Sequence, residues 1–257
     1  DDEYLQARYI DVCCRKVSRA VKGSLLEGAG IASAMPEGVP IKKRDRRASF
    51  AQQSLSSSIH FSDAPPVVEG PKAGGHLGFK KEQLQDQNFA LDVLIPEVVA
   101  IAANYKEQKH IPVIAAGGIS TGEDIAHFME LGASGVQMGS IFVTTLECDA
   151  SETFKEVYIH SKSEDVLIIE SPVGMPGRAI LNPFLQQIKE GVRPAIKSCF
   201  QCLEHCDIRT IPYCITQALV NAAEGDENNA LLFCGSNAYR AEKIEKVDDV
   251  MKELVGE

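Results

Sequence analysis

The sequence predicts an α/β protein: a β/α barrel of the TIM type, incomplete on its amino-terminal side, with a helical, cysteine-containing appendage at the carboxyl end. Short apolar, β-rich runs end in glycine, and segments with helical spacing lie between them. A complete barrel takes roughly 250 residues. The chain has 257 residues, yet strands are legible only from residue 66 onward. Part of the barrel is therefore expected to be missing or too irregular to see.

Residues 1–65 form a predicted irregular amino-terminal remnant. The segment Tyr4 to Val21 is expected to make one helix. The basic run Lys42 to Arg47 is expected to be a solvated loop and not a nucleic-acid patch, because the chain as a whole is acidic. The alternative is that short strands lie within 28–41 and 57–67 and help to close the barrel.

Residues 66–183 form the predicted β/α core with its phosphate-binding loops. Its strands are expected near Val67-Val68, Ile111–Ala116, Gly135–Met138 and Val166–Ile169. Strands separated by crossover helices pair in parallel. The core should therefore be a parallel sheet, either in a barrel or open.

The clearest helix of this core lies between the second and third of these strands. Ser120 and Glu123 match a Ser-x-x-Glu capping box, which marks a helix start. Ile125, Phe128 and Met129 then repeat on one helical face. We expect this helix to pack that face against the sheet.

Residues 184–257 form the predicted appendage, with helices expected over Ile215–Ala223 and Glu242–Leu254. Four cysteines of this part stand close together in the sequence: Cys199, Cys202, Cys206 and Cys214. Closely spaced thiolates suit zinc or an iron-sulfur cluster, which makes these residues candidate metal ligands. The alternative is a set of reduced, partly buried thiols, which are ordinary in a cytosolic protein.

Composition and charge exclude some classes of partner. The chain carries 26 Lys and Arg against 36 Asp and Glu, a net charge of −10, which argues against binding nucleic acid or an anionic membrane surface. No apolar run approaches the roughly 20 residues that span a bilayer, and the sequence opens Asp1-Asp2-Glu3 where a secretory signal would be basic and then apolar. We expect a soluble, cytoplasmic protein that acts on a small molecule. Homo-oligomer formation is left open.

Two glycine-rich turns follow neighbouring strands of the predicted core. Gly117-Gly118 ends one strand and Gly139-Ser140 ends the next. Without side chains, backbone N–H groups approach a phosphate closely, and a helix start adds positive partial charge. In many β/α barrels, paired loops of this kind bind a phosphate. The alternative is that these glycines only make tight turns.

A further glycine-rich segment, Glu69–Gly78, contains a candidate catalytic residue. Gly74 and Gly75 permit the close approach of a planar cofactor, and His76 follows them directly. An imidazole titrates near neutral pH, so it can accept a carbon-bound proton and return it. Arg178 is expected either near the barrel mouth, paired with an anionic substrate, or in a surface ion pair.

These segments, in this order, resemble the nitronate monooxygenase family, whose members are FMN-binding β/α barrels. The FMN-dependent enoyl-acyl-carrier-protein reductases belong to the same superfamily and have a similar AGGH loop. The segments SPVGMPGRAILNP, 171–183, and FCGSNAYR, 233–240, are also similar to family members. The resemblance implies that His76 is the catalytic histidine and that Gln137 lies beside the flavin. It implies that the FMN phosphate is bound at these positions: Gly117, Gly118, Gly139 and Ser140.

The resemblance implies an oxidoreductase that uses FMN and O2 to convert alkyl nitronates to a carbonyl compound and nitrite. One alternative is an NAD(P)H-dependent and FMN-dependent enoyl thioester reductase on the same scaffold. Family members begin with a strand and a QGGMG-like loop that support the flavin, and no such segment is found here. A truncated, non-catalytic derivative is therefore the second alternative.

Overall fold

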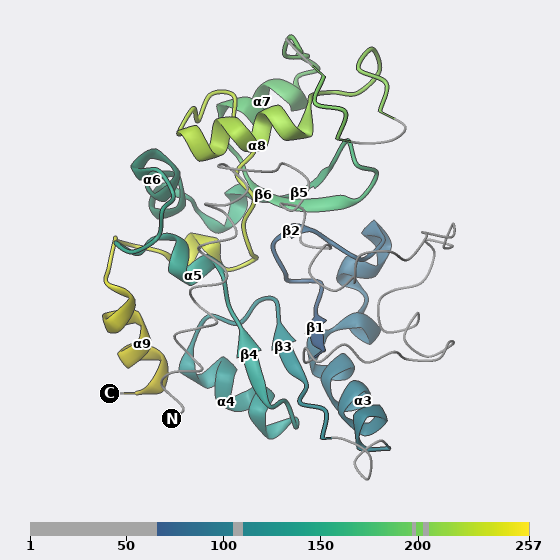
Figure 1. Ribbon diagram of the computed structural model, residues 1–257, viewed down its shortest axis with the longest axis vertical. Helices are drawn as coiled ribbons and strands as arrows, with labels where there is room; N and C mark the ends of the chain where they lie inside the picture. Colours follow the sequence, from purple (N-terminus) through teal and green to yellow (C-terminus); the bar gives the residue numbers. More distant parts are fainter. Residues whose placement is uncertain (1–65, 105–109, 197–198, 203–205, 257) are drawn as a thin grey trace.

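The computed structural model describes residues 66–104, 110–196, 199–202 and 206–256. The helix, the basic loop and the alternative strands predicted for residues 1–65 lie outside the described residues. The described part contains two small sheets, one parallel and one antiparallel, with helices packed around each (Figure 1).

The parallel sheet has the strand order β1-β3-β4. Its strands are β1 (Val67–Glu69), β3 (Ile114–Ala116) and β4 (Gly135–Gln137). Val68 pairs with Ala115, and Ala115 pairs with Val136. The three apolar runs that end in glycine are therefore confirmed as neighbouring parallel strands.

Two crossover helices join these strands. Helix α3 (Leu91–Ala103) lies between β1 and β3, after two short 3-10 turns, η1 (Lys81–Gln85) and η2 (Gln87–Phe89). Helix α4 (Gly122–Glu130) lies between β3 and β4. This order is that of two consecutive β/α units.

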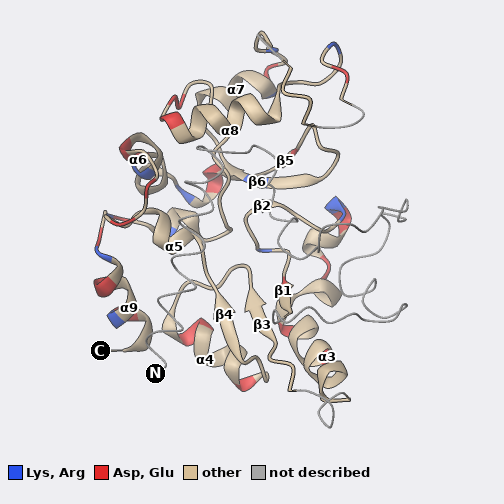
Figure 2. Cartoon of the chain, in the orientation of Figure 1, with Lys and Arg blue, Asp and Glu red and all other residues tan. Residues whose placement is uncertain are grey.

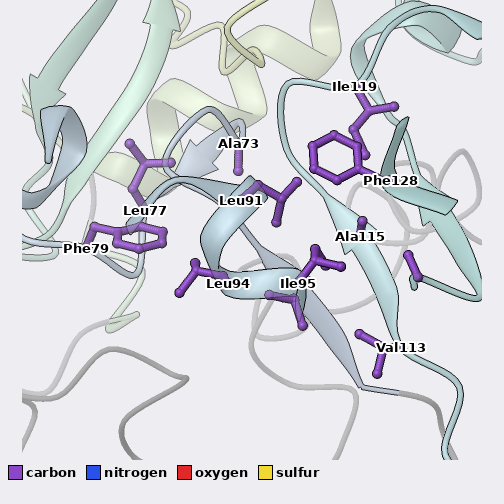
Figure 3. Packing of buried hydrophobic residues seen from close by; sticks show 12 residues of the cluster. Ala73, Leu77, Phe79, Leu91, Leu94, Ile95, Val113, Ala115, Ile119 and Phe128 are labelled. Atoms are coloured by element: carbon purple, nitrogen blue, oxygen red, sulfur yellow. The ribbon is translucent and has the colours of Figure 1, made fainter. Parts of the chain in front are cut away.

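Helix α3 covers the parallel sheet with its apolar face. Figure 3 shows Leu91, Leu94 and Ile95 of this helix near Ala115 of the central strand and Val113, the residue just before that strand. All five are buried in one hydrophobic cluster. Because Ala115 is small, the helix can approach the strand closely, and this packing fixes the end of β3 from which a glycine loop departs.

Helix α4 begins one residue later than the sequence predicts. Its N-cap is Thr121, whose Oγ1 accepts a hydrogen bond from the Asp124 N–H at 3.1 Å, while the Asp124 carboxylate accepts one from the Thr121 N–H at 3.1 Å. The predicted Ser120 and Glu123 pair is therefore wrong by one position. Of the predicted apolar face, Phe128 is buried but Met129 is 45% exposed.

The second sheet is antiparallel and has the order β2-β6-β5. It consists of β2 (Gly75–His76), β5 (Val166–Glu170) and β6 (Pro176–Ile180). The strand predicted at Val166–Ile169 exists, but the prediction that it joins the parallel sheet is wrong. A tight turn at Gly174, with φ of +79°, folds β6 back along β5, and a hairpin of this length can only be antiparallel.

The remaining helices are α5 (Ser140–Val143), α6 (Glu152–His160), η3 (Ser163–Asp165), α7 (Pro183–Lys189), α8 (Ile215–Glu224), η4 (Ala238–Arg240) and α9 (Val247–Val255). The helix predicted at residues 215–223 is confirmed. The helix predicted from residue 242 begins only at residue 247. The reason is that Glu245 still forms a parallel bridge with Thr145, which holds the chain extended.

The carboxyl-terminal residues pack on the β/α core. Val250 and Leu254 of α9 form a buried cluster with Phe142 of α5, and Phe233 forms a bridge with Ala179 of β6. The predicted boundary at residue 183 stays a prediction. Across the described ranges, the strands form two separate sheets and no closed barrel, so the fold is mixed α/β with a parallel sheet.

Candidate active site

The loop that carries the predicted histidine is held by a buried arginine. The Arg178 guanidinium, on β6, donates one hydrogen bond to the Pro71 carbonyl at 2.9 Å and a second to the Ala73 carbonyl. Arg178 is only 9% exposed. Both predictions for this residue, an ion pair at the surface or a salt bridge with a substrate, are therefore corrected. Its guanidinium holds the loop between β1 and β2 by binding two of the loop's carbonyl oxygens.

The charge of Arg178 has no carboxylate partner among the residues that the structure describes. The nearby thiol of Cys234 does not supply one, because burial raises the pKa of Cys234 to about 12 and keeps the thiol neutral. The guanidinium is thus stabilised by backbone carbonyl oxygens alone. Losing it would leave two loop carbonyls without donors.

His76 lies at the end of this loop, on β2, between a hydroxyl and an aromatic ring. Its Nε2 is 2.7 Å from Ser171 Oγ, and its ring meets the Phe233 ring edge-on at a centroid distance of 4.8 Å. Ser171 Oγ also accepts a hydrogen bond from the Val173 N–H. Burial lowers the pKa of His76 below its usual value, so the imidazole is neutral at neutral pH. A neutral imidazole is the form that accepts a proton.

The two predicted phosphate loops leave adjacent strands. Ala116 of β3 pairs with Gln137 of β4, so Gly117-Gly118 and Gly139-Ser140 follow the same edge of the sheet. Gly117 and Gly118 have φ values of +98° and +81°, which favour glycine. A Cβ on Gly117 would lie 2.9 Å from the Ala73 nitrogen. The first loop is thus held against the histidine-bearing loop.

Residues 233–240 join the histidine-bearing loop and the two glycine loops. No role in the site is predicted for this segment from the sequence. The Gly235 N–H donates to Ser140 Oγ at 2.8 Å, and the Ser236 N–H donates to the Lys72 carbonyl at 3.1 Å. Asn237 Nδ2 donates to the Gly118 carbonyl at 2.8 Å and to Ser120 Oγ at 3.0 Å. The signal that could have found it is the turn-forming sequence Gly-Ser-Asn after the apolar run at residues 230–234.

The predicted glycine pair of the histidine-bearing loop has two different surroundings. A Cβ on Gly74 would lie 2.8 Å from backbone atoms of Cys234 and Gly235, so the missing side chain makes room for residues 233–240. Gly75, with φ of +72°, has nothing within 4 Å of such a Cβ. Of the two, Gly75 borders open space.

The residues around the two loops fit a phosphorylated cofactor. No atom lies within 4 Å of a Cβ built on Gly139, and Ser236 Oγ is buried without a hydrogen-bond partner. In the part of the chain that the structure describes, the backbone N–H groups of Gly118 and Gly139 also have no acceptor. Open space beside unused donors is what an anionic group such as a phosphate requires.

The structure describes all four cysteines that are predicted as metal ligands. Cys199 is exposed, whereas Cys202, Cys206 and Cys214 are half-buried, and all four are free thiols. Among the described residues, no group of three or more His, Cys, Asp or Glu side chains is arranged to hold a metal ion. The role of these four cysteines as metal ligands therefore stays a prediction.

In the described ranges, no helix has both the length and the apolar character needed to cross a bilayer.

A comparison with protein-family models matches residues 53–257 to the nitronate monooxygenase family. The chain belongs to that family. The match includes His76, both glycine loops and residues 233–240, so the candidate site lies entirely within the matched region.

Curated relatives carry the same family name. A probable nitronate monooxygenase of Staphylococcus aureus strain Newman is 37% identical over 125 residues, which are 48% of this chain and 33% of the relative. A probable nitronate monooxygenase of Staphylococcus saprophyticus is 36% identical over 126 residues, 48% of this chain and 34% of the relative. The match thus spans about one third of the length of these relatives.

Solved structures give the same fold. FabK from Thermotoga maritima is 27% identical with a TM-score of 0.53, and the match covers 74% of this chain and 52% of FabK. A nitroalkane oxidase from Streptomyces ansochromogenes is 25% identical with a TM-score of 0.51, covering 74% of this chain and 50% of that protein. About half of each of these structures therefore has a counterpart here.

Proposed function

We propose that the chain takes part in the FMN-dependent oxidation of alkyl nitronates by O2 to a carbonyl compound and nitrite. The observation that carries the proposal is that residues 233–240 contact both the histidine and the glycine loops. Phe233 packs on the His76 ring, and two residues later the Gly235 N–H donates to Ser140 Oγ. A neutral base and a candidate phosphate site are thus brought together by one short segment.

The same geometry supports FMN as the cofactor. The backbone N–H groups of Gly118 and Gly139, with the unpartnered Ser236 hydroxyl, would hold the phosphate. Gly75 borders open space, which would let the flavin ring approach the backbone. Gln137 is the last residue of β4, directly before the second glycine loop. When bound, FMN supplies an electron acceptor that can pass its electrons on to O2.

His76 is proposed as the general base when the substrate is a neutral nitroalkane. The α C–H bond breaks, its electron pair moves into the nitro group to give the nitronate, and the proton goes to the imidazole. This role requires the tautomer in which Nε2–H donates to Ser171 Oγ, because Nδ1 then keeps its lone pair. Burial favours the neutral ring that the step needs, since it lowers the pKa of His76.

The test compares two substrates of the same carbon skeleton, a neutral nitroalkane and its preformed nitronate. His76→Ala, in the full chain loaded with FMN, is expected to lower turnover of the nitroalkane by about a hundredfold or more, since general-base catalysis contributes effects of that size. Turnover of the nitronate should fall far less, because no proton has to be removed. His160→Ala, an exposed histidine of α6, serves as the matched control. Equal losses with both substrates would remove the general-base role.

The likeness to FabK supports a second candidate, an enoyl thioester reductase that uses NAD(P)H and FMN. The two reactions differ in what reduces the flavin. Anaerobic bleaching of the bound flavin by NAD(P)H favours the reductase, and bleaching by a nitronate favours the oxidation. A full chain that binds no FMN under either condition would favour the non-catalytic derivative.

We further propose a cytoplasmic location and small-molecule substrates. The six cysteines that the structure describes are all free thiols, which suits a reducing compartment. The net charge of −10 opposes binding to nucleic acid. Cell fractionation with an antibody against the chain would test the location.

A further inference from the structure

Two cationic side chains flank the first glycine loop. Arg240 donates from its Nη1 to Ser120 Oγ at 3.0 Å. The stem of Lys72 lies against Gly118: its Cβ and Cδ are 2.7 and 2.9 Å from where a Cβ of Gly118 would stand. Lys72 belongs to the histidine-bearing loop and Arg240 to residues 233–240. Both segments are joined by the hydrogen bond from the Ser236 N–H to the Lys72 carbonyl.

Neither cation is neutralised by a carboxylate among the described residues. Arg240 is exposed, and the one described hydrogen bond of its guanidinium goes to the Ser120 hydroxyl. Lys72 is exposed and forms no described ion pair. Figure 2 shows that acidic residues are instead spread over α4, α6 and α9. The first glycine loop therefore has two cations beside it, in a chain whose net charge is −10.

One acidic residue, Asp124, lies next to this loop, and its carboxylate is hydrogen-bonded to the backbone. The Asp124 carboxylate accepts hydrogen bonds from the N–H groups of Ser120 and Thr121 at 2.8 and 3.1 Å. Burial alone would raise the pKa of Asp124, but these hydrogen bonds lower it, so the group stays ionised as the cap of α4. The same carboxylate also accepts a hydrogen bond from Ser120 Oγ at 3.4 Å, so Arg240 is linked to it through this hydroxyl and forms no direct ion pair with it.

We infer that Arg240, together with Lys72, binds the phosphate monoester of the flavin and makes the site selective for FMN over riboflavin. The inference rests on the proposed FMN site and adds the charges that the glycine loops lack. Backbone N–H groups orient a phosphate, whereas a guanidinium and an ammonium neutralise its charge of about −1.5 to −2. Arg240 is held next to the loop by Ser120, so its side chain is partly ordered before the phosphate arrives.

The experiment measures the dissociation constants of FMN and riboflavin by flavin fluorescence, using the full chain. Arg240→Gln is expected to weaken FMN binding by about tenfold, since a charge-assisted hydrogen bond is lost, and to leave riboflavin binding unchanged. Arg240→Lys should recover part of the FMN affinity. Inorganic phosphate should compete with FMN for the wild-type chain and compete less well for Arg240→Gln. Arg209→Gln is the matched control, because Arg209 is an exposed arginine engaged by Asp207.

Each outcome decides a different question. Equal FMN affinity in Arg240→Gln and the wild type overturns the assignment of Arg240 and leaves the proposed function standing. Equal weakening of both flavins in Arg240→Gln shows a structural role and also overturns it. Failure of the wild-type chain to bind either flavin overturns the proposed function, and this assignment with it. Far-ultraviolet circular dichroism of each variant confirms that the chain is folded before binding is measured.

Discussion

The parallel and the antiparallel sheet supply different kinds of group to the candidate site. The parallel sheet contributes backbone: Gly117-Gly118 and Gly139 stand at strand ends where side chains are absent. The antiparallel sheet contributes side chains: His76 lies on β2, Arg178 lies on β6, and Ser171 follows β5. We therefore expect the first region to be sensitive to added atoms, and the second to be sensitive to removed ones.

The largest effect is expected from adding one methyl group to the parallel region. In Gly117→Ala, the new Cβ would lie 2.9 Å from the Ala73 nitrogen, and the backbone φ of +98° is unfavourable for alanine. We expect the free energy of unfolding to fall by about 4 kcal/mol, combining the backbone strain with overpacking. Urea denaturation monitored by circular dichroism measures it.

Gly139→Ala is the matched control for that change. Its φ is −126°, and nothing lies within 4 Å of the new Cβ. Stability should change by no more than about 0.5 kcal/mol. FMN affinity should nevertheless fall, because the methyl group enters the space proposed for the cofactor. Equal destabilisation by both alanines would contradict the difference drawn between the two glycines.

The second effect comes from removing a side chain of the antiparallel region. Arg178→Met keeps the apolar stem but leaves the carbonyls of Pro71 and Ala73 without donors. The expected loss is about 3 kcal/mol in the free energy of unfolding, the range for hydrogen bonds to a charged group. Thermal unfolding measures it, with Arg209→Met as an exposed control whose loss should be small. A change as small as that of the control would show that the guanidinium does not hold the loop.

A smaller effect is expected at the partner of the histidine. Ser171→Ala removes the hydroxyl that lies 2.7 Å from His76 Nε2. The expected cost is about 1 kcal/mol in stability, with a fall of about tenfold in nitroalkane turnover because the ring loses its fixed orientation. Ser171→Thr, which keeps the hydroxyl, should restore part of both. Steady-state kinetics on the nitroalkane and its nitronate would separate orientation of the base from general damage.

The smallest effect is on the pH dependence of stability. Burial lowers the pKa of His76 below its usual value of 6.5, so the unfolded chain binds a proton more readily than the folded chain. The contribution of this group to stability is therefore complete above about pH 6.5 and is lost as the pH falls from there through the lowered pKa. His76→Gln should flatten the stability profile in that window. Denaturation midpoints measured from pH 7.5 to 5.0 test it, and an unchanged slope would contradict the shift.

The parallel region could be predicted from the sequence, and the reason is local. A run such as Ile111–Ala116 followed by Gly117-Gly118 carries both its strand character and its end within a few residues. Helices α4 and α8 were legible for the same reason, because caps and periodicity are local signals.

The antiparallel region could not be predicted in the same way, because its arrangement depends on distant residues. Pro176-Gly177 reads as a turn in the sequence, yet these residues begin β6, where Gly177 lies against the Phe233 ring. The role of Arg178 depends on carbonyls about one hundred residues earlier in the chain. Likewise, the turn-forming sequence within residues 233–240 marks a turn but does not reveal that this segment contacts three separate loops.

Helix α9 packs against the start of α4, so shortening or tagging the chain at this helix would disturb the candidate site. A Cβ on Gly122, the first residue of α4, would stand 2.6 Å from the carbonyl oxygen of Leu254. The last turn of α9 therefore touches the helix that starts directly after the first glycine loop. A deletion after residue 246 would remove Val250 and Leu254, which pack in one cluster with Phe142, and would expose the start of α4. Expression boundaries should keep residues 247–255, and an affinity tag at this end should follow a flexible spacer.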